Sequence, residues 1–363
     1  MQLAFTEEQE ELRRSARAFL AEHSSSERVR AAMASELGWD TDAWKRIGAE
    51  LGWTAVAIPE SLGGVGLGFV ELVGLLEEMG EALLCAPFFA SVCMAAPALL
   101  ASGDSAAARE WLPAIAEGRA TAALVEGGAI ARRRGAGFSL DGSARLVLDG
   151  HAADLLVVAA THAAGLSLFA VPAGTRGVER RAHATMDQTR RFAEVTLSGV
   201  EVGAGALLGA EGQGAPALAH ALDQARVALA AEQTGGAQRC LDLAVGYAKE
   251  RVQFGRAIGS FQAIKHKCAD LMVAVESARS AAYWAGCVAA ERSEELPRAA
   301  SLAKAWASES YFRCAADALQ IHGGVGFTWE YDVHLHLKRA RSMEAFLGAP
   351  SWHRERVAGM MLA

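Results

Sequence analysis

Apolar residues near the start of the chain recur at the spacing of helical turns. In the segment FTEEQEELRRSARAF, which continues into the following residues, Ala16 and Leu20 lie four residues apart on one face. Thr6 and Gln9 have the spacing of a capping box, which begins a helix. Helical patterns continue, interrupted by the Pro/Gly-rich loop AIPESLGGVGLG, to about residue 118. We therefore predict a helical N-terminal domain over residues 1–118.

The pattern changes over residues 119–205. Short runs rich in Val and Leu, among them RLVLDG, DLLVVAA and AEVTLSGVEV, are separated by glycine clusters. Such runs between turn residues are typical of strands. We predict a small β domain in this part of the chain.

After a Gly/Ala-rich joint the helical period returns, and we assign residues 206–363 to a C-terminal domain. The loops between its helices are short, which favours antiparallel neighbours as in a four-helix bundle. Helices combined with a separate β domain place the chain in the α+β class. The predicted helices span residues 216–249, 260–291, 297–322 and 330–346.

One long uncharged segment raises the question of a membrane span. No charged residue occurs between Ala82 and Gly103, which is long enough to cross a bilayer. Pro87 and Pro97 interrupt it, and proline breaks a helix interior. We predict a buried core helix with irregular ends and no membrane span.

Composition narrows the class of protein. The 35 Lys and Arg against 42 Asp and Glu give a net charge of −7, which argues against a nucleic-acid-binding protein. Six cysteines form no CxxC pair, and no His, Cys or acidic spacing indicates a metal site. The acidic, amphipathic N-terminus does not resemble a signal peptide. We expect reduced thiols in a cytoplasmic protein.

The stretch KERVQFGRAIGSFQAIKHKCAD carries candidate binding groups. It reads as a helix end, a turn at Gly255 and a new helix capped by Ser260. The planar guanidinium of Arg251 suits a pyrophosphate, Phe254 offers a stacking face, and Gln262 offers an amide. An ordinary helix–loop–helix corner with an exposed arginine is the alternative.

The stretch ALQIHGGVGFTWEYD contains a second candidate. Gly323 and Gly324 directly follow a helical run, so they either cap that helix in the αL conformation or let a ligand approach the backbone closely. No strand precedes them and the spacing is not GxGxxG, so this is not a Rossmann fingerprint.

Together these two stretches, the N-terminal FTEEQEELRRSARAF and the AIPESLGGVG loop resemble the acyl-CoA dehydrogenases, over essentially the whole chain. The resemblance implies a helical N-terminal domain, a middle β-barrel and a C-terminal four-helix bundle. It implies α,β-dehydrogenation of an acyl-CoA thioester with FAD as the hydride acceptor. It also implies an oligomeric enzyme whose reduced flavin is reoxidised by an electron-transferring flavoprotein.

The resemblance also assigns residues. It implies that Arg251, Phe254 and Gln262, with Gln320, Gly323 and Gly324, touch the adenine–pyrophosphate half of an FAD held mainly by a partner subunit. It places Arg226 near the bound acyl-CoA.

The family's general base is missing from both of its usual places. The commoner place lies 17 residues after Glu330, which is Leu347, followed as in the family by a glycine. The other place lies just before Arg226, which is Ala225. Neither side chain accepts a proton. We therefore name no catalytic residue.

The β domain departs from the family as well. Where the family has a Thr-Glu-Pro-Gly-like stretch and a Trp-Ile-Thr stretch beside the flavin, this chain has LVEGGAIARRRG and ARLVLDGHAAD. Glu126 survives, but the hydroxyl donors and the tryptophan do not. The resemblance thus implies an intact half-site that reaches a partner's FAD and a degraded half-site for the chain's own flavin ring.

This asymmetry suggests the base-lacking subunit of a heteromeric α2β2 enzyme for bulky acyl-CoA substrates such as sterol side chains, with a Glu-bearing paralogue as partner. One alternative is a homo-oligomer that uses another acid, for which the candidates are Asp223, Glu232 and Glu344. Another is a flavin-free structural or regulatory subunit. The acyl group itself is not readable from the sequence.

Overall fold

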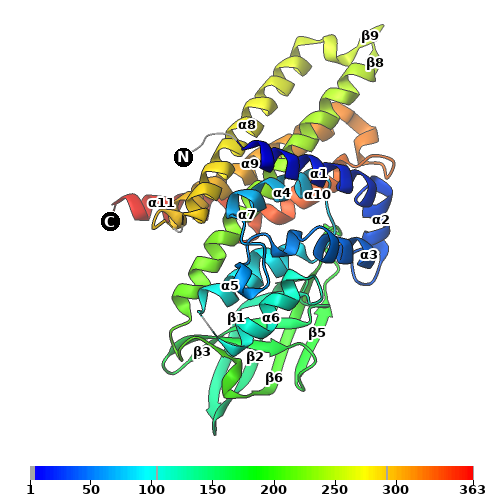
Figure 1. Cartoon of the computed structure of the whole chain (residues 1–363). Helices are drawn as coiled ribbons and strands as arrows, with labels where there is room; N and C mark the ends of the chain where they lie inside the picture. Colours follow the sequence, from blue (N-terminus) through cyan, green and yellow to red (C-terminus); the bar gives the residue numbers. More distant parts are fainter. Residues whose placement is uncertain (1–4, 104, 292, 363) are drawn as a thin grey trace. The chain divides into compact units, whose positions relative to one another are not determined.

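The computed structural model describes residues 5–103, 105–291 and 293–362 and divides the chain into two compact units (Figure 1). The helical unit comprises Met1–Ala31, Phe69–Leu84 and Arg226–Ala363, and the sheet unit comprises Ala32–Gly68 and Cys85–Ala225. Helices at both ends and strands in the middle confirm the predicted α+β order. The three sequence domains remain our proposal.

The N-terminal third is helical, as predicted. Helix α1 begins with the capping box: the Thr6 side chain accepts from the Gln9 amide at 3.3 Å, and the Gln9 side chain accepts from the Thr6 amide at 2.9 Å. These bonds satisfy two amides that have no partner within the helix. The helices are α1 (Glu7–His23), α2 (Ser26–Ala34), α3 (Thr41–Lys45), α4 (Phe69–Glu81), α5 (Ala96–Ala101) and α6 (Ala106–Ala116).

The uncharged segment forms an interrupted, buried helix. A π-helical stretch, Phe89–Ala95, leads into α5, which has Pro97 in its first turn, and nearly every residue of both is buried. Proline fits the first turn because an amide there has no helical partner. No helix among the described residues has the length and apolar character that crossing a membrane requires.

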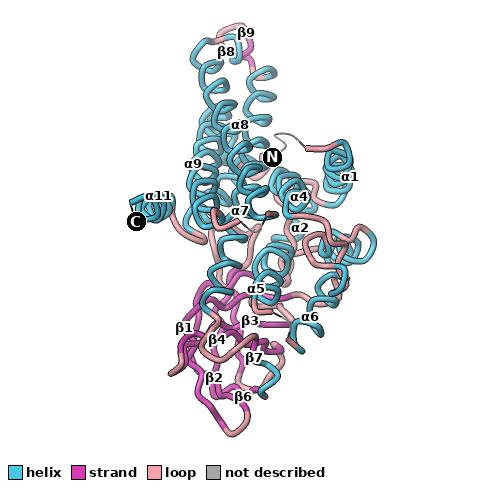
Figure 2. Tube along the Cα trace, turned by 60° about the vertical axis from the view of Figure 1, so that its left-hand side comes forward, coloured by secondary structure: helices cyan, strands magenta, loops and turns pink. Residues whose placement is uncertain are grey.

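The predicted β domain is a seven-stranded sheet with the order β5-β6-β2-β1-β3-β4-β7 (Figure 2). Neighbours are antiparallel except β1 and β3, which pair in parallel. Its core consists of small and branched side chains such as Ala123, Val158 and Val195, all fully buried. The strands are β1 (Ala122–Arg134), β2 (Gly137–Leu148), β3 (Leu155–His162), β4 (Gly165–Pro172), β5 (Val178–Ala182), β6 (Phe192–Val202) and β7 (Leu207–Leu208).

The four predicted C-terminal helices are present, with ends within three residues of the prediction. Buried residues from all four, including Cys240, Leu271, Tyr311 and Ala340, form one core. A fifth helix was not predicted, because it buries only three residues, one of them a histidine. The helices are α7 (Ala215–Glu250), α8 (Gln262–Ala290), α9 (Leu296–His322), α10 (Val333–Ala345) and α11 (Pro350–Leu362).

Two glycines let α4 and α7 touch backbone to backbone. A Cβ added at Gly80 would lie 1.9 Å from the Glu232 carbonyl oxygen, and one added at Gly235 would lie 1.8 Å from the Glu77 carbonyl oxygen. Neither position admits a side chain unless the two helices move apart.

We therefore expect Gly80→Ala to lower the free energy of unfolding by about 1–3 kcal/mol, the usual cost of overpacking. Gly246→Ala on α7 is the matched control, because a Cβ there meets no atom within 4 Å. The control should be neutral or stabilising, since alanine is the better helix former. Urea unfolding followed by circular dichroism measures both, and equal midpoints would contradict the close approach.

Candidate functional site

The first candidate stretch folds into a β-hairpin with a two-residue loop. Strands β8 (Val252–Gln253) and β9 (Arg256–Ala257) pair antiparallel, and the loop residues Phe254 and Gly255 have φ of +52° and +77°. Positive φ at both loop residues is the requirement of a type I′ turn, whose twist matches that of the strands. The turn predicted at Gly255 is confirmed.

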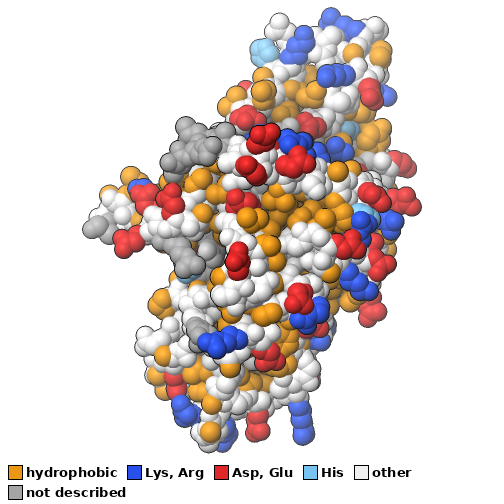
Figure 3. Space-filling model, viewed as in Figure 1, with side chains coloured by type: hydrophobic (Ala, Val, Ile, Leu, Met, Phe, Trp, Pro, Cys, Tyr) orange, Lys and Arg blue, Asp and Glu red, His pale blue; other side chains and the backbone are white. Residues whose placement is uncertain are grey.

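This turn presents Phe254 and Arg251 to solvent. The Phe254 ring is 91% exposed, although φ is in a region that non-glycine residues rarely adopt. Arg251 is exposed, and among the described residues its guanidinium makes no hydrogen bond or ion pair. Lys and Arg side chains gather at this end of the helical unit (Figure 3). Both groups are therefore free to contact a ligand.

The start of α8 differs from the prediction. Ser260 does not cap the helix; its hydroxyl donates to the Ala257 carbonyl oxygen at 2.7 Å within a short 3₁₀ turn, Ile258–Ser260. The N-cap position is Phe261, which has no side-chain cap. Gln262 is the first residue of α8 and is exposed, so its amide remains available.

The second candidate stretch lies at the end of α9. Gly323 has φ +65° and ψ −145°, so it ends the helix outside the αL conformation. Gln320, Gly323 and Gly324 are exposed, and a Cβ at either glycine would meet no atom within 4 Å. A ligand can therefore approach this backbone closely, although the Gly323 amide itself donates to the carbonyl oxygens of Gln320 and Leu319.

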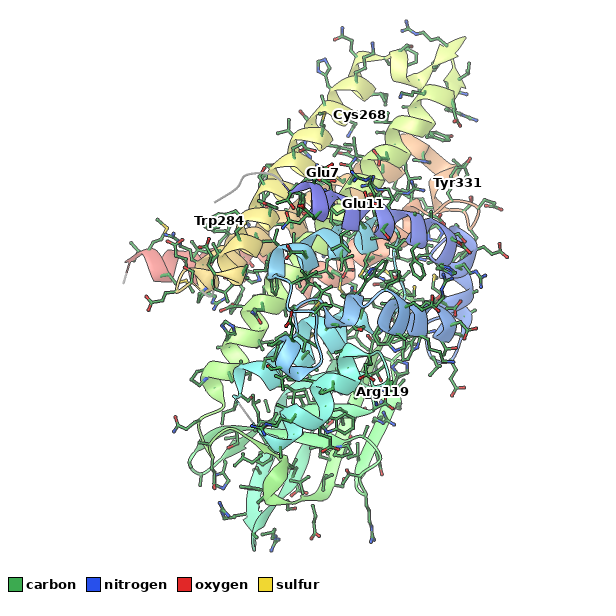
Figure 4. The ribbon with its side chains drawn as sticks, viewed as in Figure 1. Glu7, Glu11, Arg119, Cys268, Trp284 and Tyr331 are labelled. Carbon is green, nitrogen blue, oxygen red and sulfur yellow. The ribbon has the colours of Figure 1, made fainter. Side chains whose placement is uncertain are left out.

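Stacked aromatic rings join the two stretches. His322, at the end of α9, stacks on Tyr247 of α7 with 4.3 Å between the ring centroids. The Arg251 amide in turn donates to the Tyr247 carbonyl oxygen at 2.9 Å. Tyr331, labelled in Figure 4, packs against both rings at 5.6 and 6.2 Å. The two motifs therefore belong to one end of the helical unit.

Arg226, which directly follows the second of the family's base positions, contacts the backbone of the first position, Leu347. The Arg226 Nε donates to the Leu347 carbonyl oxygen at 3.1 Å, and its guanidinium lies over the Trp352 ring at 5.1 Å. Leu347 is 8% exposed and has φ +61°. Position 347, which the count from Glu330 reaches, is thus bound by Arg226 through its backbone, and its side chain is aliphatic.

None of the three candidate acids is an unengaged carboxylate. Asp223 is 3% exposed and is not free. Glu232 is bound by Arg339 at 2.7 Å in a buried ion pair. Glu344 is half-buried and is bound by Arg341 one helical turn earlier. A general base needs an unencumbered carboxylate within reach of the substrate.

The N-terminal domain model of the acyl-CoA dehydrogenases matches residues 6–119, and the C-terminal domain model matches residues 212–362. Over 345 residues the chain is 38% identical to acyl-CoA dehydrogenase IpdE2 of Mycolicibacterium smegmatis, covering 95% of this chain and 96% of the relative. The chain belongs to the acyl-CoA dehydrogenase family. Its members are oxidoreductases that act on CH–CH groups with FAD as cofactor.

Solved structures agree with this assignment. The ChsE4–ChsE5 complex of Mycobacterium tuberculosis contains a chain 28% identical with a TM-score of 0.93, covering 100% of this chain and 99% of that one. A variant of the steroid acyl-CoA dehydrogenase Tcur3481–Tcur3483 is 31% identical with a TM-score of 0.89, and 98% of each chain is covered.

The residues present fit one half of FAD. At the end of the helical unit, an unpaired guanidinium, an exposed aromatic ring and two open glycines offer what an adenine and a pyrophosphate need. In the sheet unit, residues 123–134 of β1 and 145–149 at the end of β2 carry no hydroxyl and no indole, and Leu146 is 67% exposed. These two segments therefore offer a flavin ring no hydroxyl and no indole, and their only side-chain donors are arginines.

The sequence did not reveal that Lys304 contacts the segment around position 347. Lys304 is fully buried, and its Nζ donates to the Ser308 hydroxyl at 2.7 Å and to the carbonyl oxygens of Met343, Glu344 and Gly348 at 3.1–3.3 Å. Burial lowers the pKa of Lys304 to about 7, against the attraction of Glu344. A lone lysine in the Ala/Ser-rich run SLAKAWAS was the only signal in the sequence.

Lys304 and Arg226 therefore hold the segment that contains position 347. Between them the two cations bind four carbonyl oxygens at and after the end of α10, including those of Leu347 and Gly348. Such carbonyls have no partner within a helix and attract cations. Arg226, which the resemblance placed near the substrate, donates from its Nε to this backbone.

Proposed function

We propose that this chain is the base-lacking subunit of a heteromeric FAD-dependent acyl-CoA dehydrogenase, an α2β2 assembly with a Glu-bearing paralogue. One observation carries the proposal. At position 347, where the commoner family base is expected, the chain has a buried leucine, and Arg226 binds the carbonyl oxygen of that residue. The partner would remove the α-proton of the acyl-CoA.

In this assembly the chain's own contribution is to bind FAD from across the interface. Arg251 would bind the pyrophosphate, Phe254 would stack on the adenine, and Gln262 would donate its amide. Gln320 and the Gly323–Gly324 backbone would line the same half of the cofactor. When bound there, FAD would supply the acceptor for the hydride that leaves the β-carbon. The role of these residues is to fix the cofactor in position.

The names of the structural relatives support a heteromer and suggest a substrate class. The ChsE4–ChsE5 and Tcur3481–Tcur3483 structures each name two components, and the second is described as a steroid acyl-CoA dehydrogenase. We propose a bulky, steroid-like acyl-CoA as substrate and an electron-transferring flavoprotein as acceptor. Six free cysteines support a reducing compartment such as the cytoplasm.

The structure gives less support to the alternatives. A homo-oligomer with another base would need one of three acids that are already engaged. A flavin-free subunit would have no use for an exposed Phe254 in a strained turn, or for an unpaired Arg251 beside it.

Flavin absorbance per subunit tests the proposal, measured for the chain alone and after co-expression with its paralogue. We expect little flavin and no dehydrogenation from the chain alone, and both from the complex. One FAD per subunit together with activity in the lone chain would overturn the proposal. Glu344→Gln in the complex should leave the rate unchanged.

In the complex, Arg251→Gln removes a charge-assisted bond to phosphate worth about 1.5–3 kcal/mol, so FAD should bind roughly ten- to a hundredfold more weakly. Arg298→Gln is the matched control, because Arg298 is partly exposed and, in the part of the chain that is described, its ion pair is with its helical neighbour Glu295. Fluorescence of released flavin measures both affinities. Equal affinities in the two variants would remove Arg251 from the FAD site.

A further inference from the structure

The helical unit contains a cavity that the proposed function does not use. It has a volume of about 370 Å³, and its lining residues, which come from α1, α2, α4, α7, α10 and their ends, all belong to this unit. None of the residues proposed to contact FAD or the position of the base lines it. Its size is in the range of small-molecule sites.

Two opposite charges line this cavity without meeting. Arg239 of α7 and Glu81 at the end of α4 are both half-buried. Among the described residues neither side chain makes a hydrogen bond, and no ion pair of 4.0 Å or less joins the two. Burial, followed by the nearby Glu78 and Asp242, raises the pKa of Glu81. Two partly desolvated, unpaired charges favour a ligand that complements both.

The other charges around the cavity are already paired. Arg17 binds Glu78 at 2.8 Å, and Arg30 binds Asp332 at 2.7 Å. These pairs leave Arg239 and Glu81 as the charged groups available to a ligand within this lining.

A buried histidine adds a donor beside Arg239. His336 is 2% exposed and lines the cavity, and its Nδ1 is 2.9 Å from the Tyr311 hydroxyl. Burial and the neighbouring Arg239 and Arg339 lower its pKa to about 3, so the ring is neutral. When the Tyr311 hydroxyl donates to Nδ1, Nε2 carries the proton. Within the described part of the chain, the hydrogen bond of the His336 ring is the one at Nδ1.

We propose that this cavity binds a small zwitterion of the α-amino acid type. Its carboxylate meets the Arg239 guanidinium and the His336 Nε2–H, since a guanidinium matches a carboxylate with two parallel bonds. Its ammonium group meets Glu81. Its aliphatic side chain packs on the apolar lining, formed by Leu20, Val29, Leu83 and Leu335.

L-Leucine is the probe, with 4-methylpentanoate and 3-methylbutylamine as analogues that each lack one charge. Calorimetry on the full-length chain should detect leucine binding at least tenfold tighter than either analogue. Absence of leucine binding, or equal binding of 4-methylpentanoate, would overturn the proposal. The readout requires neither FAD nor the paralogue, so its outcome is independent of the proposed function.

Two variants locate the ligand in this cavity. Arg239→Gln should weaken leucine and 4-methylpentanoate binding roughly ten- to a hundredfold, the value of a lost charged hydrogen bond. The isosteric Glu81→Gln should weaken leucine and leave 4-methylpentanoate no weaker. Arg14→Gln is the control, because Arg14 is exposed and paired with Glu11 on α1. Circular dichroism confirms folding, and unchanged leucine affinity in both cavity variants would refute this site.

Discussion

Arg339→Met should lower the free energy of unfolding by about 3–5 kcal/mol, one of the two largest effects we expect in this chain. Arg339 on α10 is 2% exposed, and its Nη1 lies 2.7 Å from the Glu232 carboxylate on α7. Removing Arg339 takes a buried counter-charge away from the Glu232 carboxylate, and breaking a buried pair in this way costs far more than the net value of the pair. Urea unfolding followed by circular dichroism measures the loss.

Two further variants isolate the charge effect. Adding Glu232→Gln to Arg339→Met also removes the buried Glu232 carboxylate charge, so the double variant should recover part of the lost stability. Arg341→Met on the same helix removes an exposed pair with Glu344, and it should cost less than about 1 kcal/mol. If the double variant is no more stable than Arg339→Met alone, the loss comes from packing and not from the buried charge.

The second large effect is a dependence of stability on pH that Lys304→Met abolishes. Burial lowers the pKa of Lys304 from 10.5 to about 7 in the folded chain. Between these values the unfolded chain binds more protons than the folded chain, so stability rises with pH. The penalty for burying the ammonium is complete below about pH 7 and disappears as the pH approaches the unfolded value.

The wild-type chain should therefore gain about 1 kcal/mol per pH unit relative to Lys304→Met between pH 7.5 and 9.5. All other titrating groups are common to both chains, so the difference between their unfolding free energies isolates Lys304. Lys265→Met, a change at an exposed site, should show no such trend. A difference that stays constant with pH would mean that Lys304 has an ordinary pKa.

Local signals predicted most of the fold. The Thr6 capping box and the long C-terminal helices were predicted because their patterns lie within one element. Helix α11 was missed because burial of only three residues leaves almost no hydrophobic periodicity. The cap at Ser260 was wrong because a 3₁₀ turn delays the start of α8, and no side-chain pattern signals such a turn.

The candidate site divides in the same way. The residues proposed for FAD lie on two short motifs, so a resemblance could assign them by number. The Lys304 contacts join α9 to carbonyl oxygens about 40 residues further along the chain, which no spacing rule predicts. The sequence likewise did not predict the ion pairs that engage Glu232 and Glu344.

The way in which position 347 is held has a consequence for how such a subunit arises. Lys304 and Arg226 donate hydrogen bonds to backbone carbonyl oxygens and not to the side chain of residue 347. Every amino acid has such a carbonyl oxygen. After a gene duplication, one copy can therefore exchange a catalytic side chain for leucine without losing the fold. In the heteromer that we propose, the proton transfer would then remain with one copy and the cofactor contacts with the other, and this division would require few substitutions.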